Sequence, residues 1–414
     1  MRRLHLCLLA FLPALACAQS AIPLSLAEVE ALWREHSREL RMAAAMVDAA
    51  AGDLKTAGQA PNPELSLNFL QISRNSGTTT GNWLDKKVDS QLRVDQLIER
   101  GGKRELRQRS AGARLEAAHL DLADTSRQQL AELRRAYFDL KLVQEKAALA
   151  AETAALYARS VEAAQKRLKA GDLAPVDVAR LGIDQSRADS EARAVQAELV
   201  QARQALAYLI GRESTAAGLS ASDSWPPADD EVLADGLPAQ RADLEAARRR
   251  SEAADAERDL ARAKRARDIT VGVQYEHYAQ NMPVNSYGIG VSIPLFVWHE
   301  HEGEIARAEA DALTASLQAQ KVAAMAGGQW AQARAQLLAA RERVRRLDGG
   351  LLADAERVAQ AAELAYAKGA MGLIDLLDAR RTLRQLRVEA VTARADYAKA
   401  RADWQAQMDS GKTP

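Results

Sequence analysis

The sequence predicts a mainly α-helical protein with a membrane β-barrel part, built from two copies of one unit. The segment from Gly171 to Asp177 reads GDLAPVD, and the segment from Gly369 to Asp375 reads GAMGLID, 198 residues later. Alanine-rich and charge-rich stretches with a helical pattern flank both segments, and each repeat also contains two strand-like stretches. A repeat of this length indicates a duplicated half-protein rather than a stacked array of short repeats.

The offset between the two copies changes once along the chain. Leu97 matches Leu295 at the same offset of 198, whereas Leu65 matches Ile269 at an offset of 204. The extra residues of the first copy fall between residues 72 and 87, a polar stretch that we expect to be a loop. Two offsets that each hold over a stretch of sequence support a single duplicated unit.

The N-terminal residues 1–18 have the features of a secretory signal peptide. Two arginines precede an apolar run, and Ala16-Cys17-Ala18 forms a small-residue cleavage site, so we expect the mature chain to begin at Gln19. Both cysteines of the chain, Cys7 and Cys17, lie in this leader, so the exported protein would have no disulfide. Cleavage before Cys17 remains an alternative, and it would leave a lipidated cysteine.

The composition limits the possible partners and folds. Acidic and basic residues are equal in number, 56 of each, so the sequence shows no basic surface that favours nucleic acid. Aromatic residues make up only 4% of the chain and much of the apolar fraction is alanine, which suits close helix packing rather than a thick core. The mature chain lacks an apolar run of about 18 residues, so a membrane role would have to use strands.

The first repeat is expected to cover residues 19–211. It begins with a helix capped by Ser25 that runs to about Gly58. Two strands are expected next, at about 64–72 and 87–98, because apolar residues alternate there with Ser, Asn, Asp, Gln and Arg. Each strand would therefore have one polar face and one apolar face.

The second repeat is expected to cover residues 238–414 and to show the same order. Its strands are predicted at about 268–278 and 286–297, where Ile, Val and Tyr alternate with Gly, Thr, Gln and Ser. The lengths match the nine to eleven residues, roughly, that a tilted strand needs to cross an outer membrane. Phe296 and Trp298 stand at the end of the last strand, as residues of an aromatic belt would.

A very long helical stretch follows each pair of strands, at about 103–210 and about 304–408. Each stretch is expected to be interrupted once and to fold into a hairpin, with tips near 171–177 and 369–378. An uninterrupted limb of about 65 residues would be roughly 100 Å long. Between the repeats, residues 212–237 are rich in Ser, Asp and Pro and predict a surface connection.

Four strands cannot form a closed barrel. In lipid every backbone N–H and C=O group must be paired, so a four-stranded sheet with an apolar face would be completed by other copies of the chain. Three copies supply twelve strands, an even number within the known range, and the polar faces would line a water-filled lumen. The alternative is a soluble periplasmic coiled-coil binding protein whose strands form an ordinary sheet.

The sequence resembles the outer membrane efflux protein family, the TolC-like trimeric ducts of tripartite exporters. The resemblance covers essentially the whole mature chain. It implies a homotrimer in which a twelve-stranded β-barrel in the outer-membrane lipid is continuous with a helical barrel in the periplasm, and whose partners are a periplasmic adaptor and an inner-membrane resistance-nodulation-division (RND) pump. The matching segments are Leu26-Ala27-Glu28 with Glu39-Leu40, Pro61-Asn62-Pro63, Gln96 to Arg104, Arg241-Ala242-Asp243-Leu244 and the paired Gly/Asp motifs.

The resemblance also implies a periplasmic gate at the hairpin tips. Asp375 and Asp378 would face the pore, and Tyr366 would help to hold it shut by hydrogen bonding to Asp177. Residues three apart share a helix face, so three copies would bring six carboxylates to the axis, a ring that attracts cations. Met371 departs from the family pattern, because a basic gating residue is expected at this position.

Helix capping is the alternative interpretation of these carboxylates. Gly171 and Gly369 are expected to form the tip turns, and Asp177 and Asp375 follow them by a few residues, where a carboxylate stabilises a helix N-terminus. Asp378 lies a turn further into its helix and is less easily explained in this way.

The segment from Ile98 to Arg104 is most similar to the heavy-metal branch of the family, the ducts of cobalt, zinc, cadmium or copper efflux. Selection of cargo by the pump would leave little trace in the duct itself, so a multidrug or type I secretion channel stays an alternative. His299 and His301, within His-Glu-His-Glu, are metal-ligand types. We favour a polar strand-to-helix connection, because two His at i and i+2 cannot share a helix face.

Neither an enzyme activity nor a cofactor is expected. Gly101-Gly102-Lys103 lacks the glycine spacing and the hydroxyl residue of a phosphate-binding loop. The tip carboxylates have no His, Lys or nucleophile close in sequence that would complete an acid–base site. We therefore expect a passive outer-membrane exit duct that extends into the periplasm.

Overall fold

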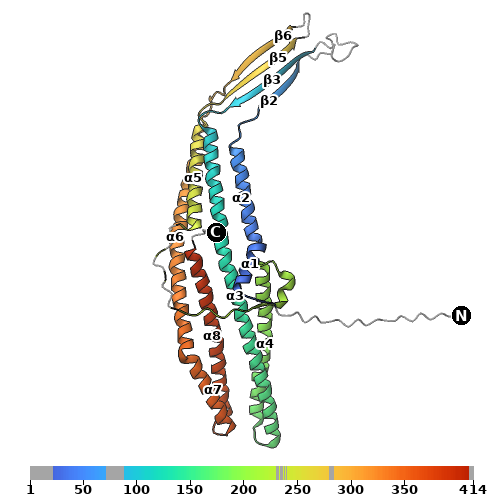
Figure 1. Ribbon diagram of the computed structural model, residues 1–414, viewed down its shortest axis with the longest axis vertical. Coiled ribbons are helices and arrows are strands. Elements are labelled where there is room, and N and C mark those ends of the chain that lie inside the picture. Colours follow the sequence, from blue (N-terminus) through green and yellow to red (C-terminus); the bar gives the residue numbers. More distant parts are fainter. Residues whose placement is uncertain are drawn as a thin grey trace, which may run out of the picture. The chain divides into compact units, whose positions relative to one another are not determined.

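The computed structural model describes residues 22–70, 88–229, 233, 236, 238, 240–278 and 284–409, and Figure 1 draws them as long helices and a small sheet. The predicted signal peptide and the predicted loop between residues 72 and 87 lie outside the described residues. The α-helices are α1 Leu26–His36, α2 Arg38–Ala57, α3 Lys103–Ala170, α4 Pro175–Leu209, α5 Ala242–Ala263, α6 Glu302–Arg346, α7 Leu352–Ala367 and α8 Leu373–Met408. The strands are β1 Ile22–Leu24, β2 Glu64–Leu70, β3 Asp89–Ile98, β4 Leu219–Ala221, β5 Ile269–Tyr278 and β6 Val284–Ser292.

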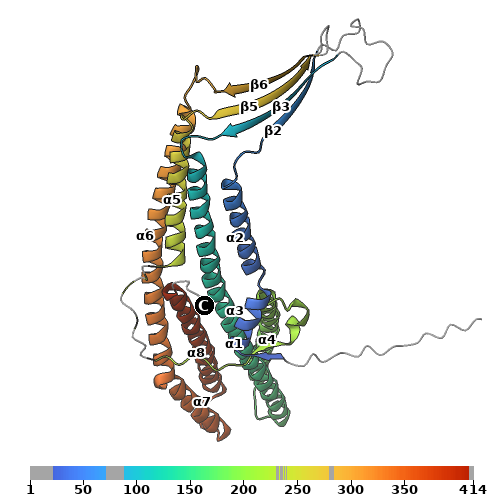
Figure 2. The same cartoon turned by 45° about the horizontal axis from the view of Figure 1, so that its top comes forward.

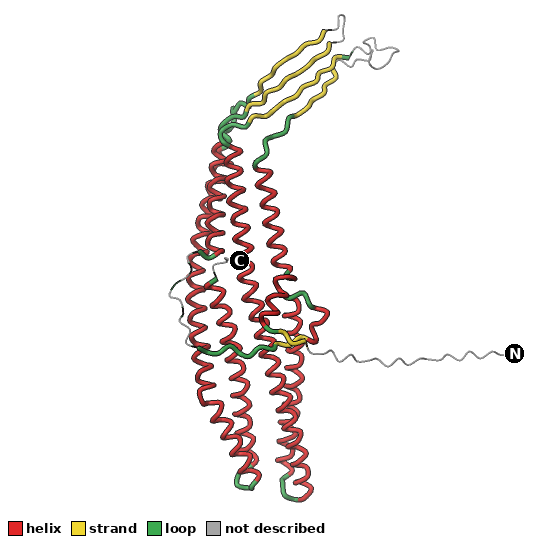
Figure 3. Tube along the Cα trace, viewed as in Figure 1, coloured by secondary structure: helices red, strands yellow, loops and turns green. Residues whose placement is uncertain are grey.

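The contacts divide the chain into two compact units, and each unit draws on both sequence repeats. Unit 1 contains the chain up to Ser37, residues Gln129–Leu233 and residues Gln332–Ala406. Unit 2 contains residues Arg38–Gln128, Ala234–Ala331 and the chain from Gln407. Unit 2 therefore holds the large sheet, and unit 1 holds the two helical tips coloured as loops in Figure 3. The fold is thus not one domain per repeat.

The sheet of unit 2 joins the two repeats through its central strands. Its order is β2-β3-β5-β6, and every neighbouring pair is antiparallel. Strand β3 of the first repeat pairs with β5 of the second, from Ser90 opposite His277 to Ile98 opposite Ile269. Figure 2 shows the four strands side by side, with β2 and β6 at the edges.

Alternation along the strands gives the sheet one polar and one apolar face. On the apolar face, Tyr287 and Ile289 of β6 are 83% and 82% exposed. On the polar face, Arg93 Nε donates to Asp95 Oδ2 at 2.7 Å, and Arg93 NH1 donates to Gln274 Oε1 at 3.0 Å. Large apolar side chains so open to solvent indicate a surface that another apolar phase or chain covers.

Alanine supplies much of the buried surface between the helices of unit 1. Ala395 and Ala398 of α8 are fully or almost fully buried. Larger buried side chains of this unit include Val29 and Trp33 of α1 and Tyr137 of α3. Small side chains allow helix axes to approach closely, so long helices can pack with few bulky residues.

A buried arginine holds the start of α5 in unit 2. Arg241 is fully buried, and its guanidinium donates to Asp243 Oδ1 at 2.9 Å and to Gln407 Oε1 at 2.6 Å. Burial acts to raise the pKa of Asp243, but the hydrogen bond and charge of Arg241 outweigh it, so this pKa is lowered. The matching segment that begins at Arg241 therefore has a structural role in fixing the helix start.

The beginning of the first repeat differs from the prediction of one helix from Ser25 to Gly58. Ser25 caps α1 as predicted, within a capping box that Glu28 completes. The helix then ends at Ser37, whose backbone has φ −58° and ψ 123°, and α2 begins at Arg38. A non-helical residue breaks the backbone ladder, so the predicted single helix is two.

Two short strands were not predicted. Strand β1 pairs in parallel with β4, from Ile22 opposite Leu219 to Leu24 opposite Ala221. Three-residue strands are too short to show alternation, and this pairing joins segments about two hundred residues apart. Part of the connection expected at 212–237 is therefore regular structure.

The second long helical stretch is interrupted twice rather than once. Besides the tip, a π-helical turn at Leu347–Leu351 separates α6 from α7. Gly350 has φ 143°, a conformation that L side chains rarely adopt. The pair Gly349-Gly350 explains this interruption, since glycine accommodates a break that other residues resist.

We predict that the Tyr137 hydroxyl stabilises unit 1. It donates to the Leu24 carbonyl at 3.0 Å and accepts from the Asp223 amide at 3.1 Å. Tyr137→Phe would leave both backbone groups without this partner and should lower the stability of unit 1 by about 1–3 kcal/mol. Thermal unfolding of the purified protein, followed by circular dichroism, measures the change. Tyr287→Phe serves as the control, because this side chain is exposed and its hydroxyl makes no hydrogen bond among the described residues.

The same residue predicts a loss of stability at alkaline pH. Burial raises the pKa of Tyr137 to about 12. Because the folded pKa lies above the unfolded value of about 10, the contribution is complete below pH 10 and is lost as the pH rises through about 12. The difference in melting temperature between wild type and Tyr137→Phe should shrink over this range. A difference that stays constant would contradict the assignment.

Candidate functional site at the helical tips

The two tips are built on the same backbone turn. Helix α3 ends before Gly171, which has φ 84°, and α7 ends before Gly369, which has φ 75°. In each turn the next amide bonds back to a carbonyl of the last helical turn, from Asp172 to Arg167 at 2.9 Å and from Ala370 to Ala365 at 2.8 Å. Glycine favours both turns because the left-handed conformation carries no Cβ penalty.

A small apolar cluster joins the two hairpins near their tips. Tyr157 of α3 and Leu181 and Ala188 of α4 are buried in it together with Leu377 of α8. Here the first hairpin is α3 with α4, and the second hairpin is α7 with α8. Leu377 comes from the second hairpin, and the other buried residues of the cluster come from the first. The cluster therefore exists only while the hairpins lie together.

The carboxylates predicted to face the pore lie on the exposed side of α8. Asp375 and Asp378 are both exposed, whereas Leu376 and Leu377 between them are buried. Within the described part of the chain, neither carboxylate has an ion pair or a side-chain hydrogen bond. Two uncompensated charges on one exposed face make this end of α8 electronegative.

Helix capping explains part of this arrangement. Asp177 and Asp375 each occupy the third position of a helix, where a carboxylate interacts favourably with the helix dipole. The side chain of Asp177 makes no capping bond among the described residues, and α4 has Ala174 at its cap and Pro175 at its first position. Asp378 lies beyond the first turn, so the dipole does not account for it.

Tyr366 has a different partner from the one that the resemblance implied. Its hydroxyl accepts a hydrogen bond from Arg167 NH1 at 3.0 Å, and the Arg167 guanidinium carbon lies 5.6 Å from the centre of its ring. The described residues contain no Tyr366–Asp177 bond. Arg167 belongs to the last turn of α3, and its long side chain reaches the second hairpin, so Tyr366 still joins the two tips.

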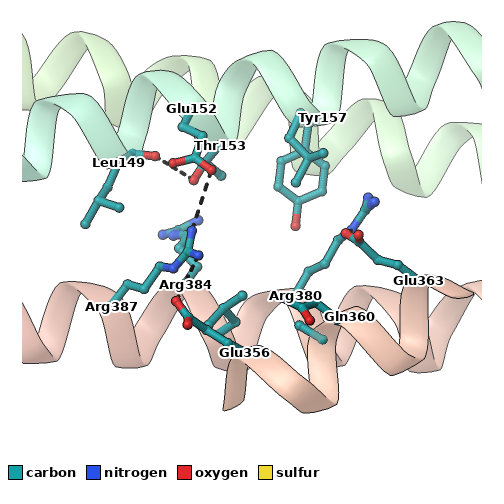
Figure 4. A pocket seen from close by; sticks show the side chains of 13 residues that line it. Leu149, Glu152, Thr153, Tyr157, Glu356, Gln360, Glu363, Arg380, Arg384 and Arg387 are labelled. Atoms are coloured by element: carbon teal, nitrogen blue, oxygen red, sulfur yellow. Dashed lines mark hydrogen bonds and ion pairs between the residues drawn. The ribbon is translucent and has the colours of Figure 1, made fainter. Parts of the chain in front are cut away.

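A series of arginines on α8 was not predicted as functional from the sequence. Arg381 NH2 donates to both carboxylate oxygens of Asp184 at 2.8 Å, and Asp184 is buried. This hydrogen bond and charge raise the pKa of Arg381. Figure 4 labels Arg380, Arg384 and Arg387, which line a cavity of about 250 Å³ between the hairpins. The spacing of these arginines was visible in the sequence, but their partners come from distant segments.

His299 and His301 lie at the start of α6. The His301 Nδ1 atom is 3.1 Å from Glu304 Oε1, and the rings of the two histidines are 5.8 Å apart between centroids. Lys264 and, to a smaller degree, His301 lower the pKa of Glu304 to about 2. The described residues contain no group of three or more His, Cys, Asp or Glu side chains that could hold a metal ion.

The turn before α6 is also unusual in its backbone. His301 has φ 66° directly before the helix, and Gly102 has φ 69° directly before α3 in the first repeat. A left-handed turn thus begins both long helices, although only the first repeat uses glycine there. In the described chain, His301 is the one residue other than glycine with a positive φ.

None of the helices that the structure describes has the length and apolar character needed to cross a membrane.

Comparisons with known proteins cover nearly the whole chain. The family model described as outer membrane efflux protein matches residues 31–212 and 233–406. The chain is 30% identical over 383 residues to the cobalt-zinc-cadmium resistance protein CzcC of Cupriavidus metallidurans. The matched region covers 89% of this chain and 86% of CzcC.

Solved structures share the fold of this chain. The outer membrane protein VceC of Vibrio cholerae has a TM-score of 0.75 at 21% identity, covering 92% of this chain and 95% of its own. A structure of CusC, described in connection with transmembrane channel formation, has a TM-score of 0.72 at 19% identity, covering 92% and 91%. At these identities the structures show the fold, whereas the family model and CzcC show the relationship. The chain belongs to the outer membrane efflux protein family.

Proposed function

We propose that this outer membrane efflux channel works as a homotrimer that forms the passive exit duct of a tripartite export system. Three chains would form a twelve-stranded barrel in the outer membrane, continuous with a helical tube in the periplasm. A periplasmic adaptor would bind the grooves between helical hairpins, and an inner-membrane RND pump would supply the energy. The observation that carries this proposal is a four-stranded antiparallel sheet with an exposed apolar face in a chain of this family.

The edges of the sheet support the trimer. Strands β2 and β6 each have one strand neighbour among the residues that the structure describes. Unpaired backbone groups are too costly in lipid, so both edges need a partner there. Pairing of β6 of one copy with β2 of the next satisfies both edges, and three copies close a ring of a size known for outer-membrane barrels.

We propose heavy-metal cations as the cargo, with cobalt, zinc, cadmium and copper as candidates. The name of CzcC, the curated relative, supports this cargo. The exposed and unpaired carboxylates of Asp375 and Asp378 are compatible with it, because a ring of carboxylates favours cations over anions. A multidrug or type I secretion channel would have the same fold and differ in its partners.

The first test is the survival of a strain that lacks this gene, with and without the restored gene. Growth is measured over graded zinc, cobalt, cadmium and copper and over a panel of drugs. We expect sensitivity to one or more of the metals, reversed by the restored gene. Sensitivity confined to drugs would keep the duct and replace the cargo, and no sensitivity at all would contradict an export role.

The second test addresses the carboxylates of the gate. If Asp375 and Asp378 form a ring in the trimer, changing both to Asn should lower the cation-to-anion permeability ratio in planar bilayers. The effect should grow as salt is lowered from 1 M to 0.01 M, since the Debye length rises from about 3 Å to about 30 Å. An unchanged ratio at low salt would rule out this ring.

The third test addresses the restraint between the tips. Tyr366→Phe removes the hydroxyl that accepts from Arg167, and Arg167→Gln removes the cation, so each should raise the basal conductance of the trimer. Asp177→Asn measures whether Asp177 contributes to the gate. If Tyr366→Phe behaves like wild type while Arg167→Gln conducts more, the ring rather than the hydroxyl carries the restraint.

A further inference from the structure

We infer that arginines of α8 lock the two hairpins of unit 1 together through ion pairs that exchange partners, rather than being lost, when the hairpins separate. The inference rests on the proposed function, in which separation of the hairpins is the opening of the tip. It concerns four cross-hairpin links, which are Arg380–Ser160, Arg381–Asp184, Arg384–Glu191 and Arg387–Glu152.

All four arginines of the links lie on one side of α8. Positions 380 and 381 are followed by 384 and 387, and residues three or four apart share a helix face. Their partners come from both helices of the first hairpin, since Ser160 and Glu152 belong to α3 and Asp184 and Glu191 belong to α4. One face of α8 is therefore directed at the whole first hairpin.

The link between Arg381 and Asp184 is the strongest of the four. Arg381 NH2 lies 2.8 Å from both oxygens of Asp184, and the Asp184 side chain is only 9% exposed, although that of Arg381 is 56% exposed. The Arg384–Glu191 distance is 2.5 Å, but both side chains are about 40% exposed, so water screens this pair. A buried carboxylate without a cation is costly, so Asp184 contributes most to holding the hairpins together.

Two of the arginines already have a second partner on their own hairpin. Arg387 NH1 lies 3.5 Å from Glu152 of α3, while its NH2 lies 3.0 Å from Glu356 of α7. Figure 4 shows Arg387 between these two carboxylates. Arg380 is divided in the same way, with NH1 donating to Ser160 at 3.1 Å and Nε donating to Glu363 of α7 at 3.1 Å. Parting of the hairpins would leave neither cation unpaired.

Asp184 has a substitute cation on its own helix. Arg187 follows it by three residues on α4, at a spacing that brings side chains together. Arg187 is exposed and makes no hydrogen bond or ion pair among the described residues. It lines the same cavity of about 490 Å³ as Asp184 and Arg381. When Arg381 moves away, Arg187 is placed to pair with Asp184.

Exchange of partners lowers the free-energy cost of parting the hairpins. In the joined state Asp184 pairs with Arg381, and in the parted state it pairs with Arg187, so this buried carboxylate keeps a cation in both states. An element with two discrete pairings of similar free energy can be switched by a modest difference in binding. The lock can therefore be rigid at rest and still open when a partner binds.

The test compares substitutions at Asp184 and Arg187, one helical turn apart on α4, whose effects on basal conductance should have opposite signs. Asp184→Asn and, on α8, Arg381→Gln weaken the joined state, so both should raise basal conductance. Arg187→Gln removes the substitute cation and weakens the parted state, so it should lower basal conductance. We expect changes of about three- to ten-fold in opening, the range of one charge-assisted hydrogen bond in a partly exposed site. Arg193→Gln on the same helix is the matched control and should change nothing.

A second readout does not depend on conductance. Leu377 of α8 is 5% exposed and is covered by residues of the first hairpin, so a maleimide should modify Leu377→Cys only when the hairpins part. The rate is measured on the full-length protein in detergent. Arg187→Gln should slow this reaction and Asp184→Asn should speed it, each relative to Leu377→Cys alone. The helix content of every variant is checked by circular dichroism.

The Asp184→Asn background separates exchange from simple repulsion. Arg187 also repels Arg381 and Arg384, and loss of that repulsion would likewise favour the joined state. If exchange is the cause, the effect of Arg187→Gln on labelling should fall by at least about two-fold when Asp184 is Asn. An undiminished effect, or equal labelling rates for Arg187→Gln and the parent, overturns the exchange. Unchanged labelling in Asp184→Asn overturns the lock, and absence of any channel in bilayers counts against the proposed duct instead.

Discussion

Backbone pairing at the edges of a four-stranded sheet is the constraint on which the rest of the molecule depends. In the described part of the chain, β2 and β6 each lack a second strand neighbour, and the apolar face of the sheet is open to solvent. In lipid, such edges must be paired, and further copies of the same chain can supply the partners. Pairing of β3 with β5 also joins the two sequence repeats within unit 2.

The helical parts solve a different packing problem. Alanines such as Ala395 and Ala398 allow helices to approach closely but bury little apolar surface per residue. Polar contacts therefore carry much of the specificity, from the buried guanidinium of Arg241 in unit 2 to the pair of Arg381 and Asp184 in unit 1. Ion pairs that connect thin helices are easier to rearrange than a large apolar core.

Local patterns predicted the regular elements well. Alternation predicted β2, β3 and β5 to within about two residues, because one face of each strand is polar. The last strand was predicted at 286–297, but β6 ends at Ser292, so Phe296 and Trp298 lie beyond its end. Ser25 was predicted as a cap from its position and does cap α1. The break at Ser37 and the turn at Leu347–Leu351 were not predicted. The residues at these two positions are surrounded by sequence with a strong helical periodicity, and this periodicity predicts a continuous helix.

The sequence by itself determined the duplicated architecture, the strands, the glycine turns at Gly171 and Gly369 and the family resemblance. These depend on short-range conformational preference and periodicity, which a single sequence contains. Only the tertiary structure decided which side chains meet, such as Arg167 with Tyr366 and Arg381 with Asp184, separated by about two hundred residues. Such pairs depend on how whole helices lie against one another, and a difference of one helical turn in that packing would give each arginine another partner.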